Sequence, residues 1–252
     1  MTTLFDCTLG GVLLSSLDES ICVLDLREDA PKLRHAVAPA WHDGLHLLDA
    51  QRESLTVRVD FAIHTPDPAR RTQVLQAVCA WAMKGGVLTA SSHPGQQLDV
   101  RCTGLPAPAA DDWLAPLTLV FTTTTVPFWE DANLTQVSSS GAAALLVPGT
   151  AGAVPVSTMV VNNGDAPITR LTLLCGDTQM VFEGISVPAN SMFVMTQVGP
   201  VLRAYIGGQS VLSCRTAESD DSLLAICGQS CTVQAVANQP VTSIFMARGR
   251  YV

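Results

Sequence analysis

The chain has 252 residues, of which 48% are hydrophobic and only 14% charged, and its formal net charge is −8 at pH 7. This length suits two domains or one large all-β domain. No apolar run reaches the roughly 18 residues of a membrane span, and no Lys and Arg cluster of the kind that binds nucleic acid tightly is present. The surplus of apolar residues therefore predicts that the chain forms a homo-oligomer and does not insert into a membrane.

The N-terminus shows no basic segment before its short apolar run, so we expect no secretory signal and synthesis in the cytoplasm. Disulfide frameworks normally belong to small secreted domains. The cysteines are therefore expected to be reduced, buried thiols that pack as small hydrophobic residues. There are eight of them: Cys7, Cys22, Cys79, Cys102, Cys175, Cys214, Cys227 and Cys231.

The first predicted elements are a turn and a strand. Asp43-Gly44 marks a turn within residues 41–48, which are expected to feed a strand. Residues 55–63 then alternate between apolar and polar or small side chains, which predicts a half-buried strand. Its inward face is expected to carry Leu55, Val57, Val59, Phe61 and Ile63.

A helix is predicted to follow this strand. Asp67 is placed to cap the first turn, and Pro68 suits the first helical position because its missing N–H costs nothing there. Gly85-Gly86 provides the C-terminal stop. One apolar stripe has helical spacing: Val74, Leu75, Val78, Cys79 and Ala82.

Further strands are predicted after the helix, in a short apolar run at 87–90 and in alternating segments at 98–102 and 117–121. Residues 1–136 are therefore expected to form an α+β domain, with an antiparallel sheet and one main helix. The segment at 126–129, Val-Pro-Phe-Trp, ends the last of these strands.

Residues 137–155 are small, nearly uncharged and contain glycine and proline, so they are expected to be a linker or crossover. Residues 156–252 show short apolar runs separated by turn-forming residues and no helical period. This pattern predicts an antiparallel β-sandwich. Gly207-Gly208 is a candidate two-residue hairpin turn within it.

The order of these features resembles the distal tail protein family of long-tailed bacteriophages and prophages. The resemblance rests on residues 41–44, the strand at 57–61, the helix at 70–81, the segment 126–129 and the β-sandwich that follows. It implies a structural virion protein at the tail tip, whose N-terminal domain builds a hexameric ring and whose C-terminal sandwich is galectin-like. It implies contacts with the tail tube protein, tail-associated proteins and receptor-binding or baseplate proteins, with a channel through which DNA passes unbound.

Such a ring needs two complementary patches on each subunit, and sheets that continue between subunits would pair exposed strand edges. The strands at 55–63 and 117–125 are candidates for this role. The candidate interface or interdomain packing residues are Val57, Val59, Phe61, Phe128 and Trp129. For the two aromatic residues, core packing at a domain boundary is the alternative.

No catalytic, cofactor or metal site is expected. His42 and His46 have the spacing of metal ligands on a helix, but Asp43-Gly44 between them favours a turn. Cys227 and Cys231 lack CxxC spacing and favour a turn between strands, with a labile disulfide as the alternative.

Two acidic segments carry the carboxylates that a calcium site or a glycosidase would need. Residues 218–222 lack the ligand pattern of a calcium loop. Glu130 and Asp131 are adjacent on a strand and so cannot readily flank one glycosidic bond.

Two other functions compete with the architectural one. The sandwich could bind host cell-surface glycans, although it has no tryptophan and only two tyrosines, Tyr205 and Tyr251, to form an aromatic platform. A hydrolase of peptidoglycan or host polysaccharide is the weakest hypothesis, because no acid–base or metal set can be assembled. The sequence therefore predicts a scaffold that is not an enzyme.

Overall fold

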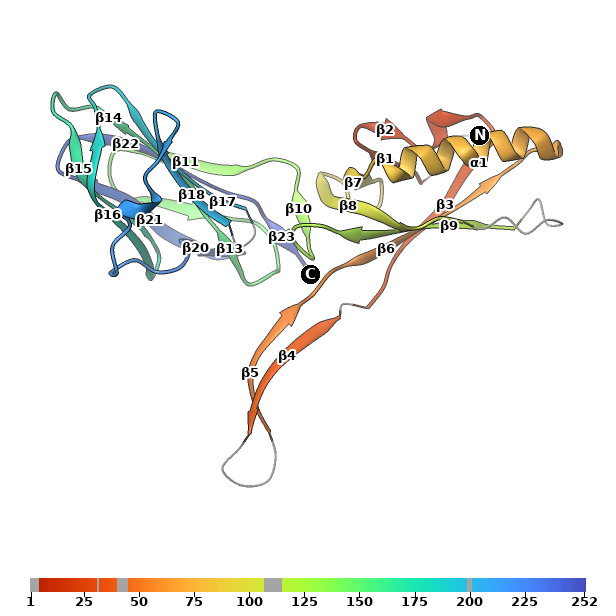
Figure 1. The fold of residues 1–252 in the computed structure, drawn as a ribbon, viewed down its shortest axis with the longest axis horizontal. Helices are drawn as coiled ribbons and strands as arrows, with labels where there is room; N and C mark the ends of the chain where they lie inside the picture. The colour runs from red at the N-terminus through yellow and green to blue at the C-terminus, as the bar shows by residue number, and fades with distance from the viewer. Residues whose placement is uncertain (1–4, 31, 40–44, 107–114, 199–200) are drawn as a thin grey trace. The chain divides into compact units, whose positions relative to one another are not determined.

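The computed structural model describes residues 5–30, 32–39, 45–106, 115–198 and 201–252, and only the backbone for 35–39, 45–51 and 198. The chain folds into two compact units, residues 1–129 and 130–252 (Figure 1). Among the described residues there is one α-helix, α1 (Pro68–Met83), and two 3-10 turns, η1 (Ser15–Leu17) and η2 (Leu212–Cys214). The rest of the regular structure is β-strand, and the main sheets are antiparallel, as the sequence predicts.

The first unit is built on a sheet with the strand order β2-β1-β7-β8-β9-β6-β3. Each neighbouring pair in this order is antiparallel. The strands are β1 (Cys7–Leu9), β2 (Val12–Leu13), β3 (Ile21–Glu28), β6 (Thr56–Ile63), β7 (Gly86–Ala90), β8 (Gln96–Gly104) and β9 (Leu117–Thr123).

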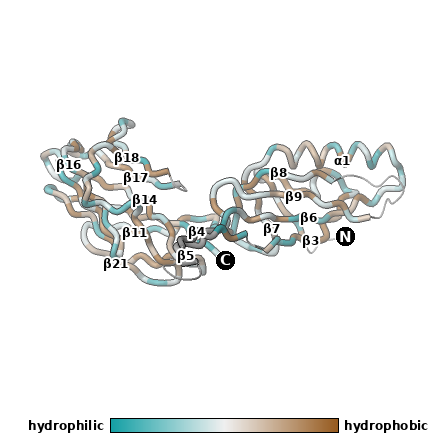
Figure 2. Tube along the Cα trace, turned by 60° about the horizontal axis from the view of Figure 1, so that its bottom comes forward, coloured by the Kyte–Doolittle hydropathy of each residue, from teal (hydrophilic) through white to brown (hydrophobic). Residues whose placement is uncertain are grey.

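Helix α1 packs its apolar stripe against this sheet. Trp81 is 3% exposed, meets Phe121 edge to face at 6.2 Å between ring centroids, and donates its Nε1–H to the Val12 carbonyl oxygen at 3.1 Å. In Figure 2, hydrophobic and hydrophilic stretches alternate along α1. Val74, Leu75, Val78 and Ala82 of the predicted stripe are buried, whereas Cys79 is only half-buried and Trp81, which the predicted stripe lacks, is buried.

Both ends of α1 lie where the sequence predicts them. Asp67 is the N-cap, and its Oδ1 accepts a hydrogen bond from the Ala69 N–H at 3.0 Å. Gly85 follows the C-cap residue Lys84 and adopts a φ of +62°, a conformation that favours glycine. Local capping chemistry therefore fixes the length of the helix.

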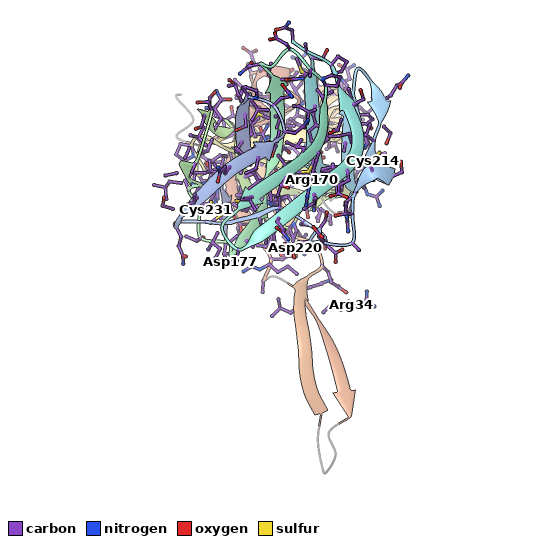
Figure 3. The ribbon with its side chains drawn as sticks, turned by 90° about the vertical axis from the view of Figure 1, so that its left-hand side faces the viewer. Arg34, Arg170, Asp177, Cys214, Asp220 and Cys231 are labelled. Atoms are coloured by element: carbon purple, nitrogen blue, oxygen red, sulfur yellow. The ribbon has the colours of Figure 1, made fainter. Side chains whose placement is uncertain are left out.

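A separate two-stranded sheet, β4 (Leu33–Pro39) and β5 (Leu45–Arg52), lies between β3 and β6 in the sequence. The pairing runs from Leu33 opposite Arg52 to Pro39 opposite Leu45. At its base the Glu53 N–H donates to the Lys32 carbonyl oxygen at 3.0 Å. Figure 3 labels Arg34 in β4 of this hairpin.

The second unit has two main antiparallel sheets. One has the order β11-β22-β14-β17-β18-β19 and the other the order β12-β21-β15-β16. Their strands are β11 (Thr135–Ser139), β12 (Ala143–Leu146), β14 (Ser157–Asn162), β15 (Ile168–Cys175), β16 (Thr178–Val187), β17 (Met192–Val198), β18 (Val201–Ile206), β19 (Gln209–Ser210), β21 (Ser230–Ala237) and β22 (Val241–Ala247).

Short strand pairs complete the second unit. β13 (Ala153–Pro155) pairs with β20 (Leu224–Ile226), and β10 (Trp129–Asp131) pairs with the C-terminal strand β23 (Arg250–Tyr251). The C-terminal strand is thus part of the fold of this unit. Arg248 adds two hydrogen bonds beside this strand pair, because its Nη1 donates to the carbonyl oxygens of Asp131 and Ala132, both at 2.7 Å.

One core lies between the two main sheets of the second unit. Phe182 in β16 and Phe193 in β17 are fully buried and meet edge to face at 4.9 Å. Leu145 in β12 and Phe245 in β22 belong to the same cluster. Side chains from both sheets therefore interdigitate, which is the packing of a β-sandwich.

The structure corrects the linker expected at 137–155. These residues contribute to β11, β12 and β13, which pair with β22, β21 and β20. The small residues of this segment favour a linker by composition, but Ala143 and Ala144 lie in a strand and pair in register with Val233 and Thr232. Strand identity at this position comes from the neighbouring strands and not from local propensity.

The proposed edge role of two strands also needs correction. β6 lies between β3 and β9, and β9 lies between β8 and β6. Both strands therefore already have two backbone partners within the first unit. A sheet cannot be extended to another subunit through either of them.

Candidate functional site

Trp129 lies in a small polar and aromatic cluster at the end of the first unit. Its indole is 3% exposed and stacks on the His93 ring, with centroids 4.1 Å apart and planes 5° apart. The Trp129 Nε1–H donates to Glu28 Oε1 at 2.7 Å, and His93 Nε2 lies 3.2 Å from the same oxygen. Sequence reasoning found the tryptophan but missed His93 and Glu28, which lie far from it along the chain.

Phe128 has a different environment. It is half-buried, and the Arg52 guanidinium lies 5.1 Å from its ring centroid, which is a cation–π contact. Arg52 is the last residue of β5. The contact therefore attaches the base of the β4–β5 hairpin to the segment that precedes Trp129.

The remaining predicted interface residues lie in the core. Val57, Val59 and Phe61 have no exposed surface within the first unit. They alternate with Arg58, which forms an ion pair with Asp29 at 2.8 Å on the opposite face of β6. We assign these three apolar side chains to the core, because a subunit contact needs exposed surface.

The β4–β5 hairpin is the best candidate for an assembly element. Its strands pair with each other, and the structure gives neither a further strand partner among the described residues. The outer edges of a two-stranded ribbon present backbone N–H and C=O groups without ladder partners. Such a ribbon is marginally stable in water by itself, so this hairpin is suited to packing against another chain.

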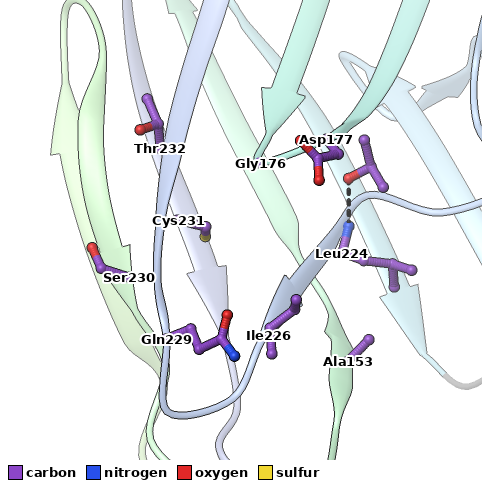
Figure 4. A pocket seen from close by; sticks show the side chains of 10 residues that line it. Ala153, Gly176, Asp177, Leu224, Ile226, Gln229, Ser230, Cys231 and Thr232 are labelled. Atoms are coloured by element: carbon purple, nitrogen blue, oxygen red, sulfur yellow. Dashed lines mark hydrogen bonds between the residues drawn. The ribbon is translucent and has the colours of Figure 1, made fainter.

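A pocket of about 560 Å³ lies in the second unit (Figure 4). A hydrogen bond from the Leu224 N–H to Thr178 Oγ1, 3.0 Å long, holds β20 beside the turn after β15. No aromatic ring lines the pocket, so it lacks the flat stacking platform that sugar sites usually present. The lining residues are Ala153, Gly176, Asp177, Thr178, Leu224, Ile226, Gln229, Ser230, Cys231 and Thr232.

The carboxylates of residues 130 and 131 accept hydrogen bonds from the C-terminal strand. Glu130 Oε1 accepts from Arg250 Nε at 2.8 Å, and Asp131 Oδ1 accepts from the Tyr251 hydroxyl at 3.0 Å. Burial and this contact with Asp131 raise the pKa of Tyr251. These carboxylates therefore hold the C-terminal strand in place.

The loop at 218–222 is similarly engaged, since Asp220 Oδ2 accepts from the Gln179 N–H at 2.7 Å and Asp221 lies 3.4 Å from Arg215. His42 lies outside the described residues, as does the side chain of His46. In the described parts of the chain, no three His, Cys, Asp or Glu side chains gather in a way that could hold a metal ion. No described helix is long and apolar enough to cross a membrane.

The eight cysteines are free thiols in the structure. Burial is predicted correctly for Cys7, Cys175 and Cys227, whereas the other five are only half-buried. Burial, with a smaller effect from Asp6, raises the pKa of Cys7 to about 12. Cys227 and Cys231 flank the turn between β20 and β21. The sulfur in contact with Cys231 is that of Cys175, at 3.5 Å, and this neighbour cannot be read from sequence spacing.

No protein-family model and no curated protein sequence matches this chain. Among solved structures it is similar to the Dit protein (gp 19.1) of phage SPP1, described as a paradigm of the hub adsorption apparatus in phages that infect Gram-positive bacteria. The TM-score is 0.73 at 13% identity, over 97% of this chain and 99% of that one.

Two structures of the phage P2 baseplate in its activated conformation, with Ca and with Sr, also align over 97% of each chain. Their TM-scores are 0.43 and their identities 6%. The similarity to SPP1 Dit extends over nearly the full length of both chains. From its first strand to its last, the chain therefore has the fold of the SPP1 Dit protein.

Proposed function

We propose that this chain is a structural protein of a phage tail tip. In this role it forms a ring at the distal end of the tail tube and joins the tube to the host-adsorption apparatus. The observation that carries the proposal is the similarity in fold to a phage hub protein, which covers 97% of this chain and so extends over both units. A single shared domain would support it far less, because common folds serve many functions.

The finer parts of the proposal concern assembly and partners. The ring is a homo-hexamer in a virion, with a galectin-like second unit and with tail tube, tail-associated and receptor-binding or baseplate proteins as neighbours. The net charge of −8 suits a channel wall along which DNA moves without binding. The role requires no catalysis.

The β4–β5 hairpin provides the physical reason for assembly. Its outer edges would gain backbone partners from a neighbouring copy, and a closed ring would satisfy every copy equally. Leu33, at the start of β4, is 51% exposed and would be buried by the same contact. The low charged fraction of the chain also agrees with a permanent interface, because such an interface would bury part of the apolar surface.

A hairpin-shortened variant tests this function. Residues 33–52 are replaced by Asn-Gly, a short link that is feasible because Lys32 and Glu53 already form a backbone hydrogen bond. The matched control replaces Gly207-Gly208, which turns between β18 and β19 with φ of +55° and +83°, by the same Asn-Gly. Native mass spectrometry and negative-stain microscopy then measure the assembly of each protein.

The intact chain and the control are expected to form rings of one subunit number, and the shortened variant a folded monomer. Circular dichroism confirms that the variant retains its sheets. A wild-type chain that stays monomeric at high concentration and shows no ring would contradict the proposed function. Rings formed equally well by the shortened variant would remove the hairpin from the assembly mechanism.

A further inference from the structure

Cys175 and Cys231 form a thiol pair within the second unit. Cys175 is the last residue of β15, Cys231 is the second residue of β21, and the two strands are antiparallel neighbours. The register places Cys175 opposite Val233, so Cys231 lies on the same face two residues away. Their sulfurs are 3.5 Å apart.

The backbone around the pair is positioned by both strands. The Gly176 N–H donates to the Thr232 carbonyl oxygen at 2.9 Å, which fixes the end of β15 beside β21. A turn begins immediately after Cys175, where Gly176 has a φ of +54°. A disulfide needs the sulfurs to approach to about 2.05 Å, and strand ends next to turns can absorb such a shift more easily than strand centres.

The two thiols differ in access. Cys175 has no exposed surface, whereas Cys231 is half-buried and lines the pocket of about 560 Å³. Figure 4 shows the Cys231 side chain beside Gly176 and Thr232 at this pocket. A small reagent can therefore reach Cys231 from the pocket, while Cys175 can react only with what Cys231 carries.

We propose that Cys175 and Cys231 form a reversible disulfide when the folded chain meets a small disulfide oxidant such as glutathione disulfide. The Cys231 thiol loses its proton, and its sulfur attacks one sulfur of the oxidant, which releases one glutathione and leaves a mixed disulfide. The Cys175 thiol then loses its proton and attacks the Cys231 sulfur, which releases the second glutathione. Two protein thiols are oxidised by two electrons, and one oxidant is reduced to two thiols.

The second step is expected to depend on pH. Burial raises the pKa of Cys175, so little reactive thiolate is present at neutral pH. Closure of the disulfide should therefore be faster in alkaline solution than at neutral pH. Because the cytosol keeps thiols reduced and the outside does not, the bond would close after release of a particle. That last consequence alone rests on the proposed function.

Peptide mapping of the full-length chain tests the pair. The protein is incubated in a glutathione disulfide buffer at pH 8, alkylated, and digested with trypsin. Cys175 lies in peptide 171–203, and Cys227 and Cys231 both lie in 216–248. The C227S variant is the matched control, because it leaves Cys231 as the one thiol in the second peptide.

Wild type and C227S are expected to lose two thiols and to yield peptides 171–203 and 216–248 joined by a disulfide. C175S is expected to stop at the glutathione adduct of Cys231, and C231S to form neither adduct nor bond at this site. The proposal is overturned if C227S keeps both thiols under these conditions, or if the wild type links Cys227 to Cys231 within one peptide. If the ring assembles normally, neither result of the peptide mapping affects the proposed function.

Discussion

At the scale of single residues, Trp129 shows how one buried side chain can hold distant parts of the first unit together. Its ring fills the space beside His93, and its N–H pairs with Glu28. W129A should lower the free energy of unfolding by about 3–5 kcal/mol, the usual cost of removing a large buried ring. W129F keeps the stacking and loses the hydrogen bond, so about 1–2 kcal/mol is expected. Urea unfolding followed by circular dichroism measures both.

The control for these variants is L134A, because Leu134 is 48% exposed and its truncation should cost little. If W129A is as stable as L134A, the indole does not contribute to the core. Its burial in the structure would then have to be explained by another contact.

Asp18 gives a prediction about pH. The Ser20 backbone N–H and hydroxyl donate to Oδ1 at 3.0 and 2.8 Å, and Arg70 Nη2 lies 2.5 Å from Oδ2. These contacts, the Ser20 hydrogen bonds first, lower the pKa of Asp18 below its ordinary value. A lowered pKa in the folded state stabilises the protein above the unfolded-state pKa of about 3.9, and this contribution disappears as pH falls through the folded-state pKa.

D18N removes the titrating group. Its urea midpoint should therefore fall less between pH 5 and pH 3 than that of the wild type, while both fall for other carboxylates. Parallel curves for the two proteins would show that Asp18 has the same pKa in the folded and unfolded states.

At the scale of elements, the start of α1 depends on one side chain. The Asp67 carboxylate accepts the Ala69 N–H, and Pro68 occupies the first position, where no N–H is needed. D67A should cost about 1 kcal/mol of stability, and D67N should recover most of it because asparagine is also a good N-cap. Equal losses in both variants would assign the effect to charge instead of capping, and urea midpoints distinguish the two cases.

How much of the fold can be predicted depends on whether a signal is local. The caps of α1 and the Gly207-Gly208 turn are local, and the structure contains both. The alternation at 55–63 correctly predicts strand β6 and its inward face, but Asp60 and Ala62 on the other face are also buried, so the second half of the strand is not half-buried. The strands within 137–155 and the central position of β6 depend on distant partners, so local propensity missed them.

The candidate sites show the same limit. Cys227 and Cys231 are close in the sequence, yet the thiol neighbour of Cys231 lies 56 residues away in β15. His93 and Glu28 form no sequence motif with Trp129, because the three residues come together only when the sheet has formed. Spacing can reveal a site on one element, whereas a site made by several strands requires their register.

At the scale of the whole molecule, each unit has a core of its own. Leu119 is fully buried in the sheet of the first unit, and Leu173 is fully buried between the sheets of the second. The division at Trp129 and Glu130 predicts that the two units unfold in separate transitions. L119A and L173A form a matched pair, because each removes the same atoms from one core.

Each variant should lose about 2–5 kcal/mol in its own unit. Hydrogen exchange followed by mass spectrometry is the measurement, since it reports protection segment by segment in the native protein. L119A should speed exchange in the buried strands of the first unit and leave β14, β15 and β22 unchanged, and L173A should do the reverse. If either variant lost protection in both units, the two units would unfold together as one cooperative body, and the division at Trp129 and Glu130 would not separate two folding units.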